Sequence, residues 1–367
     1  MKIIFSYRAG HGFSLVELLV ALALSSLLLA GMFQIFASNK QAFALQNGVS
    51  RMQENGRIAM EVMTKNLRSA GFMGCATEVD GSSFENIIDS TKYTVAGVSE
   101  LLDVFNGAAT VQVINSVVDA DSTFTGLKAP LSLSLNDVGI SVAADLASAS
   151  QGELIAGTDV ILLQYVEACE GLAVNGGGSD LNTLSVADLS ACGIGADTLV
   201  LVADCNNSEA FGVTSITDNS AANDLIQLDV TNNVQGNLAN FYDSGAFVYL
   251  PRFIMLYIAK GANDSPALYM KRLRGENAKS GFDAPLEIAQ DVESFQILLG
   301  EDDTSFSSAD GSVSRYVDTA ATNFDMDRVL AVQTSFQARS ETGLAKVGDT
   351  RLRITYQSTN TIRNRID

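Results

Sequence analysis

The sequence has a single histidine, His11, no tryptophan and only four prolines among its 367 residues. Histidine is the usual base of Ser-His-Asp and Cys-His sites and a common metal ligand, so a chain with one histidine can build few such sites. Basic residues are also scarce, because 23 Lys and Arg stand against 42 Asp and Glu, for a net charge of −19. Binding to nucleic-acid phosphates needs clustered Lys and Arg, so the composition argues against nucleic acid as a partner.

The charges are unevenly distributed along the chain. Residues 1–70 contain seven basic and three acidic residues, whereas the remainder has a net charge of about −23. A basic N-terminal segment is therefore followed by a physically different, acidic body.

Cysteines are few, and all of them lie in the acidic part: Cys75, Cys169, Cys192 and Cys205. Their spacing fits no common zinc-binding pattern. If this part is exported, the even number is consistent with two disulfides, which could be connected in three ways.

One long apolar run is present near the N-terminus. Residues 13–36 carry a single charge, Glu17, and a helix of this length measures about 36 Å, which is enough to span a bilayer. Lys2 and Arg8 precede the run and would keep the N-terminus in the cytoplasm. An ordinary secretory signal with an Ala-x-Ala site at 42–44 is one interpretation, although the run is longer than usual. A plain membrane anchor is another, but it gives no role to Glu17, whose burial is costly without a partner.

The stretch GFSLVELLVALAL resembles the class III signal of type IV pilins and pseudopilins. The resemblance implies that a prepilin peptidase cuts after Gly12 and that Phe13, the new first residue, is methylated. Glu17 becomes the fifth mature residue, and the leader with His11 is lost. In this family the glutamate is thought to meet the new amine of a neighbouring subunit. An ammonium and a carboxylate in a low-dielectric environment offset each other's desolvation, which would favour one register of helix stacking.

The helix is expected to continue beyond the membrane. Residues 37–70 contain no proline, and their apolar residues recur at helical spacing with charged residues between them. Gly48 and Gly56 weaken a helix locally, and Gly71 is a candidate C-cap with Phe72 packing back. We therefore divide the chain into a cleaved leader (1–12), a long helix and a β-rich body (71–367). The helix comprises an assembly segment (13–36) and an amphipathic segment (37–70).

The sequence of the acidic body predicts mainly strands and loops. Short β-rich runs are predicted at 159–168, 197–204, 224–230 and 253–260, with Pro251 marking the start or an edge of the last one. Residues 328–340 alternate, with Leu330, Val332, Thr334 and Phe336 on one face and Arg339 on the other. Residues 350–358 alternate likewise, so the two segments are expected to form an antiparallel pair.

Several downstream segments resemble the larger minor pilins of the PilW type: GFMGCA, ALYMKRL, IAQDVESFQILLGEDD, DRVLAVQTSFQARS and TYQSTNTIRNR. The resemblance implies an α+β fold, a pilin-like α/β-roll in which the long N-terminal helix packs on an antiparallel sheet. The body is large for a pilin, which suits a priming or tip subunit.

The body offers few candidates for chemistry. Asp302, Asp303 and Asp310 form an oxygen-rich loop that is a weak calcium candidate, since their spacing fails the EF-hand pattern. The C-terminal arginines Arg351, Arg353, Arg363 and Arg365 are expected to pair with local acids on a solvated strand face. No catalytic residue and no cofactor is expected.

The expected function is that of a minor pilin, which primes assembly of a type IV pilus and is incorporated in or at the tip of the fibre. The implied partners are other minor and major pilins, prepilin peptidase and an inner-membrane assembly platform. The chain would lie in the inner membrane, with its body in the periplasm, before it joins the extracellular fibre. Two alternatives remain open: a minor pseudopilin of a type II secretion system, and a tip adhesin or ligand-binding subunit.

Overall fold

In the computed structural model, the placement of the following residues is described: 14–72, 74, 84–88, 111–126, 133–174, 181–189, 192–204, 206–218, 223–228, 233, 237–274, 281–302, 311–325, 328–340 and 351–362. The chain divides into two compact units. The first comprises residues 1–51 and 340–352 and is called here the anchor unit. The second comprises residues 52–339 and 353–367 and is called the body.

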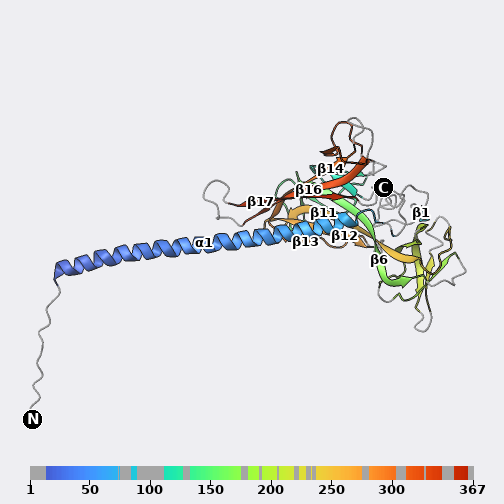
Figure 1. Cartoon of the computed structure of the whole chain (residues 1–367), viewed down its shortest axis with the longest axis horizontal. Helices are drawn as coiled ribbons and strands as arrows, with labels where there is room; N and C mark the ends of the chain where they lie inside the picture. The colour runs from blue at the N-terminus through green and yellow to red at the C-terminus, as the bar shows by residue number, and fades with distance from the viewer. Residues whose placement is uncertain are drawn as a thin grey trace, which may run out of the picture. The chain divides into compact units, whose positions relative to one another are not determined.

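The single helix of the described chain, α1, runs over Leu15–Ser69 for 55 residues (Figure 1). It ends where Gly71 adopts a φ of 80°, a left-handed conformation that glycine takes without steric cost. The N–H of Gly71 donates to the carbonyl of Gln164, and the N–H of Val166 donates to that of Phe72. The chain therefore passes from the end of α1 directly onto the edge of a central strand.

The body contains a large, mainly antiparallel sheet. Its longest path has the order β3-β2-β6-β11-β8-β9-β10-β7, and β12 with β13 extends β11 on one side. The strands are β1 (Phe84–Asn86), β2 (Val111–Ile114), β3 (Thr125–Gly126), β4 (Val142–Ala143), β5 (Leu154–Ile155), β6 (Val160–Ala173), β7 (Thr183–Val186), β8 (Leu199–Ala203), β9 (Ser208–Thr217), β10 (Asp224–Leu228), β11 (Phe247–Lys260), β12 (Pro266–Arg274) and β13 (Leu286–Gln290).

A second sheet of four antiparallel strands has the order β15-β14-β16-β17. These strands are β14 (Val292–Glu301), β15 (Arg315–Val317), β16 (Val329–Arg339) and β17 (Arg353–Thr361). The predicted pairing of the last two segments is confirmed, because Phe336 lies opposite Tyr356 in the ladder between β16 and β17. One helix with two mainly antiparallel sheets confirms the α+β class.

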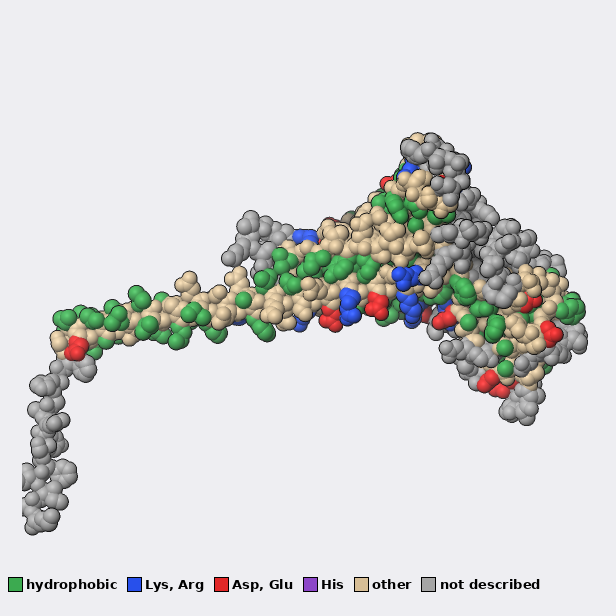
Figure 2. Space-filling model, in the orientation of Figure 1, with side chains coloured by type: hydrophobic (Ala, Val, Ile, Leu, Met, Phe, Trp, Pro, Cys, Tyr) green, Lys and Arg blue, Asp and Glu red, His purple; other side chains and the backbone are tan. Residues whose placement is uncertain are grey.

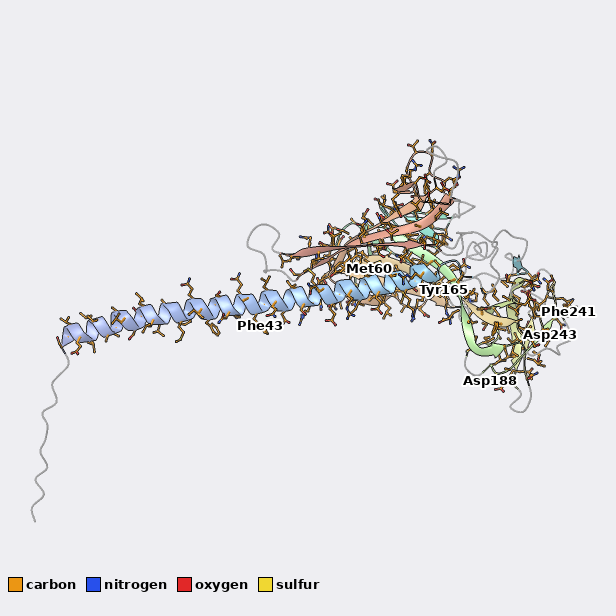
Figure 3. All side chains as sticks on the ribbon, in the orientation of Figure 1. Phe43, Met60, Tyr165, Asp188, Phe241 and Asp243 are labelled. Carbon is orange, nitrogen blue, oxygen red and sulfur yellow. A yellow bond between two sulfur atoms is a disulfide. The ribbon has the colours of Figure 1, made fainter. Side chains whose placement is uncertain are left out.

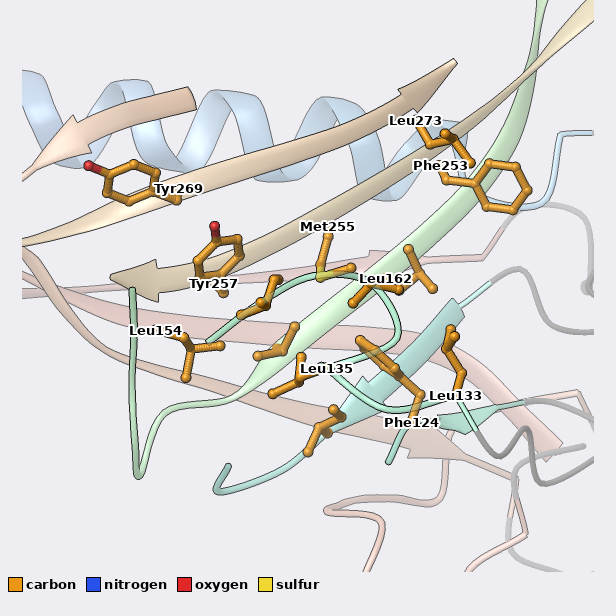
Figure 4. Close-up of a cluster of buried hydrophobic side chains, with 14 of the residues drawn as sticks. Phe124, Leu133, Leu135, Leu154, Leu162, Phe253, Met255, Tyr257, Tyr269 and Leu273 are labelled. Atoms are coloured by element: carbon orange, nitrogen blue, oxygen red, sulfur yellow. The ribbon is translucent and has the colours of Figure 1, made fainter. Parts of the chain in front are cut away.

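Two hydrophobic clusters occupy the two faces of the large sheet. One contains Phe124, Leu133 and Leu135, which come from loops and short strands that cover β6, β11 and β12 (Figure 4). The other joins the large sheet to the four-stranded sheet and to the last part of α1, with Ala59, Met63 and Leu67 of the helix buried in it. The apolar stripe predicted for this part of the helix therefore packs on the body.

Of the two positions expected for Pro251, the edge is confirmed and the start of the strand is wrong. Pro251 lies inside β11, between the residues that pair with β8 (Phe247–Tyr249) and those that pair with β12 (from Arg252). A residue without an N–H fits there because no strand occupies that side of β11 at this point. Leu330 is only half buried, because the register of β14 with β16 shifts at Gly300 and Glu301 and leaves it in a bulge.

Candidate functional site

The first half of α1 presents an uninterrupted apolar surface. None of the side chains from Leu15 to Phe36 is buried, and this part of the helix is long and apolar enough to cross a membrane. In Figure 2 hydrophobic side chains surround this segment on the visible side. The large exposed residues are Leu15, Val16, Leu18, Leu19, Val20, Leu22, Leu24, Leu27, Leu28, Leu29, Met32, Phe33, Ile35 and Phe36. A contiguous apolar surface of this size marks a membrane or protein contact.

Glu17 lies in the first turn of α1 and is exposed. The helix begins around it, since the N–H of Leu18 donates to the carbonyl of Ser14 at 3.1 Å. A carboxylate is favourable beside the unpaired N–H groups of a helix N-terminus. The expected cleavage position, Gly12, and the expected first mature residue, Phe13, lie outside the described residues.

A disulfide joins Cys169 of β6 to Cys192. Both residues belong to a third hydrophobic cluster, which includes Val186, Phe211 and Val248. The bond closes a segment that contains β7 and links it to the long central strand. The other two cysteines, Cys75 and Cys205, lie outside the described residues.

The acidic loop after β14 begins with two buried carboxylates. Glu301 pairs with Arg315 and accepts the N–H of Asp325 at 3.0 Å, and Asp302 accepts the N–H of Gly311 at 2.9 Å. The weak calcium candidate also needs Asp303 and Asp310, which the structure does not describe. Within the described ranges, no group of three or more His, Cys, Asp or Glu side chains could hold a metal ion.

Asp159 ties the two sheets together at the start of β6. Its carboxylate accepts the N–H of Ser116 at 2.8 Å and the N–H of Ile297 in β14 at 2.7 Å. The side-chain amide of Asn115 donates to it at 2.8 Å, and Asn115 in turn accepts the N–H of Thr319. Burial raises the pKa of Asp159 above its usual value, although these donors oppose the rise. The cluster is a structural joint rather than an open site.

Two other buried charges have structural partners. Glu209 accepts the N–H groups of Ala239 and Asn240 and the hydroxyl of Tyr242. The ammonium of Lys271 donates to the carbonyls of Val138 and Gly139 at 2.8 Å, and burial lowers its pKa. These contacts fix loops on the sheets.

Of the C-terminal arginines, the structure gives an acidic partner for Arg353. Arg353 contacts Glu293 at 2.6 Å. Arg339 was expected on the solvent face, yet its side chain is only 5% exposed because Asp291 and Glu293 bind it from β14 and the preceding turn. Arg363 and Arg365 lie outside the described residues.

A groove of about 890 Å³ runs along the exposed flank of the last part of α1. Gln53, Arg57, Met60, Thr64 and Arg68 recur along this flank, and Tyr356 of β17 forms the opposite wall. Figure 3 labels Met60 on this part of the helix. The sequence pattern shows charged residues between the apolar positions of this helix but gives no signal for the groove, because β17 becomes a neighbour of the helix only in the folded chain.

Comparisons with known proteins match two parts of the chain. Residues 7–33 match the model of the prokaryotic N-terminal methylation motif, and residues 255–364 match that of the type IV pilus-assembly protein W, PilW. No curated protein and no solved structure matches the chain significantly. With an exposed apolar helix and a mainly antiparallel body, these matches define a type IV pilin-like protein. Within that class, the C-terminal part of the chain is similar to PilW over residues 255–364.

The location follows from the same features. The apolar helix anchors the chain in the inner membrane, and the protein later enters the pilus fibre. Its role is that of a minor-pilin-like structural protein, and its partners are pilins and the assembly machinery of the pilus. The segment matched to the methylation motif contains Gly12, Phe13 and Glu17.

Proposed function

We propose that this chain is a minor pilin that helps prime assembly of a type IV pilus and lies at or near the tip of the fibre. The observation that carries the proposal is the exposed apolar half of α1 with Glu17 as its one charge. A lipid-facing helix gains nothing from a carboxylate, whereas a helix that must stack in one register against others does. The role is mechanical, with no catalytic step in the chain itself.

The proposed order of events begins with cleavage after Gly12 by prepilin peptidase and methylation of the Phe13 amine. The amine of one subunit then pairs with Glu17 of its neighbour as the helices leave the membrane through the assembly platform. Either charge alone is costly in an apolar environment, and the pair offsets most of that cost. Pairing of the Phe13 amine with Glu17 therefore selects one axial position of the helix, whereas apolar contacts alone would allow many positions.

The size of the body supports a tip position. A compact unit of about 300 residues has a radius of gyration of about 19 Å and is about 50 Å across. Packed helices lie about 8–10 Å apart. A wide body is easiest to accommodate where few neighbouring bodies compete for space, so we propose few copies of this chain at an end of the fibre.

Mass spectrometry of the mature N-terminus tests the processing step. A strain with prepilin peptidase should yield a chain that begins with methylated Phe13, and a strain without it should retain residues 1–12. A mature chain that begins at Leu45 instead would identify an ordinary secretory signal and overturn the proposal.

An exchange of two neighbouring residues tests the register argument. In the variant with Glu17→Leu and Leu18→Glu, composition and hydropathy are unchanged, but the acid is rotated by about 100° around the helix. The variant should be processed and inserted normally, yet it should fail to restore piliation to a deletion strain. Full restoration would show that the position of the carboxylate is irrelevant.

Counting the subunit in purified fibres tests the tip position. Label directed at the body should appear at one end of each fibre, and labelling along the shaft would contradict the proposal. The deletion strain should lose surface pili, whereas loss of protein secretion with intact pili would assign the chain to a secretion system.

A further inference from the structure

The outer edge of β17 is an open strand edge. β17 pairs with β16 on one side, and no strand of the described chain pairs with its other side. Long exposed edges attract further strands, and proteins commonly protect them with proline, lysine or a bulge. The nine residues of β17 contain no proline and no lysine, and their only charge is Arg353 at the start. The nine-residue match of β17 to β16 is also free of register shifts.

The flank of α1 lies beside this edge, on the inner side of the sheet. Tyr356 points inward, stacks on Phe336 with ring centroids 5.3 Å apart, and reaches α1 at Gly56. From there the groove continues along the helix past Arg57, Lys65 and Arg68. Tyr356 belongs both to the strand with the open edge and to the wall of the groove, and we call this edge and this groove together the recess.

The charge of the recess is opposite to that of the protein as a whole. Arg57, Lys65 and Arg68 are exposed, and Glu61 is the one acid among the residues that line the groove. Within the described part of the chain, none of these three cations forms an ion pair. Figure 2 shows basic side chains, with acidic ones between them, along the second half of α1. A net excess of two positive charges in a chain of net charge −19 favours an acidic occupant.

We propose that this recess binds an extended, acidic segment of another subunit, which adds as a strand to the open edge of β17. Side chains of an added strand alternate between the two faces of the sheet, so every second one points toward the flank of α1. Acidic residues at those positions would meet Arg57 and Lys65, while the backbone pairs with β17. The inference rests on the proposed function, because it makes the occupant a neighbouring subunit of the fibre.

A second copy of the same strand is a poor occupant. Pairing of two β17 edges would bring together two strands that contain no acidic residue. A second β17 therefore supplies no carboxylate for the basic groove. The recess therefore favours a different chain over self-association.

Site-specific photo-cross-linking in cells tests the inference with the full chain. A photoreactive residue at Thr359, on the open edge, should cross-link to another subunit, and fragment mass spectrometry should place the link in an extended acidic segment. The matched control position is Gln296, which is exposed on β14, an interior strand of the same sheet. This control should give little product.

Charge removal adds a second readout. The variant with Arg57→Gln and Lys65→Gln should give about fivefold less product from Thr359, and added salt should reduce the wild-type product in isolated membranes. The control with Arg272→Gln and Arg328→Gln removes the same charge from exposed arginines elsewhere and should leave the yield unchanged.

Equal yields of cross-linked product from Thr359 and Gln296 would overturn the inference. So would a yield from Thr359 that does not change when Arg57 and Lys65 are replaced, or a cross-linked partner segment that contains no acidic residue. A product that contains two copies of this chain also overturns it. Failure of the proposed function has a different signature, namely a chain that is not cut before Phe13 or is dispensable for pili. A chain that is processed and required for pili, but gives no product at Thr359, refutes this inference alone.

Discussion

Replacement of Gly56 by alanine tests how closely α1 approaches the four-stranded sheet. A Cβ atom built at Gly56 would lie 2.3 Å from Cε2 of Tyr356, which is far inside van der Waals contact. The ring cannot retreat, because its other face is stacked on the buried side chain of Phe336. Overpacking of this kind costs about 1–3 kcal/mol. Alanine in place of glycine inside a helix contributes about 1 kcal/mol in the opposite direction.

The expected net effect of Gly56→Ala is a loss of up to about 2 kcal/mol in the free energy of unfolding, since a cost of about 1–3 kcal/mol is reduced by about 1 kcal/mol. Denaturant unfolding of the purified full chain in detergent, followed by circular dichroism, measures it. Gly31→Ala is the matched control, since nothing lies within 4 Å of a Cβ there, and it should not destabilise the body. A smaller residue at position 356 should make the added methyl tolerable, so the effects of Gly56→Ala and Tyr356→Val should be less than additive. A stabilised Gly56→Ala variant would refute the close approach.

Three further predictions concern the body. Removal of the Cys169–Cys192 disulfide by a double change to serine should lower the free energy of unfolding by about 3 kcal/mol, because the bond joins residues with a sequence separation of 23. A denaturation midpoint that is unaffected by reductant would contradict this prediction. Asp159→Ala should cost about 3 kcal/mol by leaving buried N–H donors without an acceptor, and it can be measured in the same unfolding assay. Burial and a hydrogen bond to Glu287 raise the pKa of Tyr269 to about 12. The folded state therefore keeps a proton that the unfolded state loses above pH 10, so stability falls as the pH rises from 10 to 12, and Tyr269→Phe should make this fall less steep.

Local sequence signals predicted the helix well. The apolar run, the absence of proline and the glycine at 71 anticipated a helix that the structure places at Leu15–Ser69 with a left-handed residue just beyond it. Period-two alternation likewise predicted β16 and β17 and their pairing. In each case the decisive signal is local, because helix propensity, capping and strand alternation each depend on residues close together in the sequence.

Features that depend on distant residues were not predictable in this way. Pro251 is accommodated because β8 and β12 share one side of β11, and these strands are separated by more than 60 residues. The role of Gly56, which looks like a weak point in a helix, becomes clear only once Tyr356 lies against it. The groove has the same origin, because its walls come from residues about 300 positions apart. A single sequence contains no signal for such contacts.

The junction after α1 has a mechanical consequence for a subunit of a fibre under tension. Tension applied along the helix reaches the body through the buried residues Ala59, Met63 and Leu67. At the helix end it also reaches the body through Gly71 and Phe72, whose backbone is bonded to Gln164 and Val166 in the middle of β6. β6 is in turn paired along most of its length with β11. The load is therefore transferred to the centre of the largest sheet, where the many backbone hydrogen bonds between β6 and β11 share it. No peripheral loop carries the load alone.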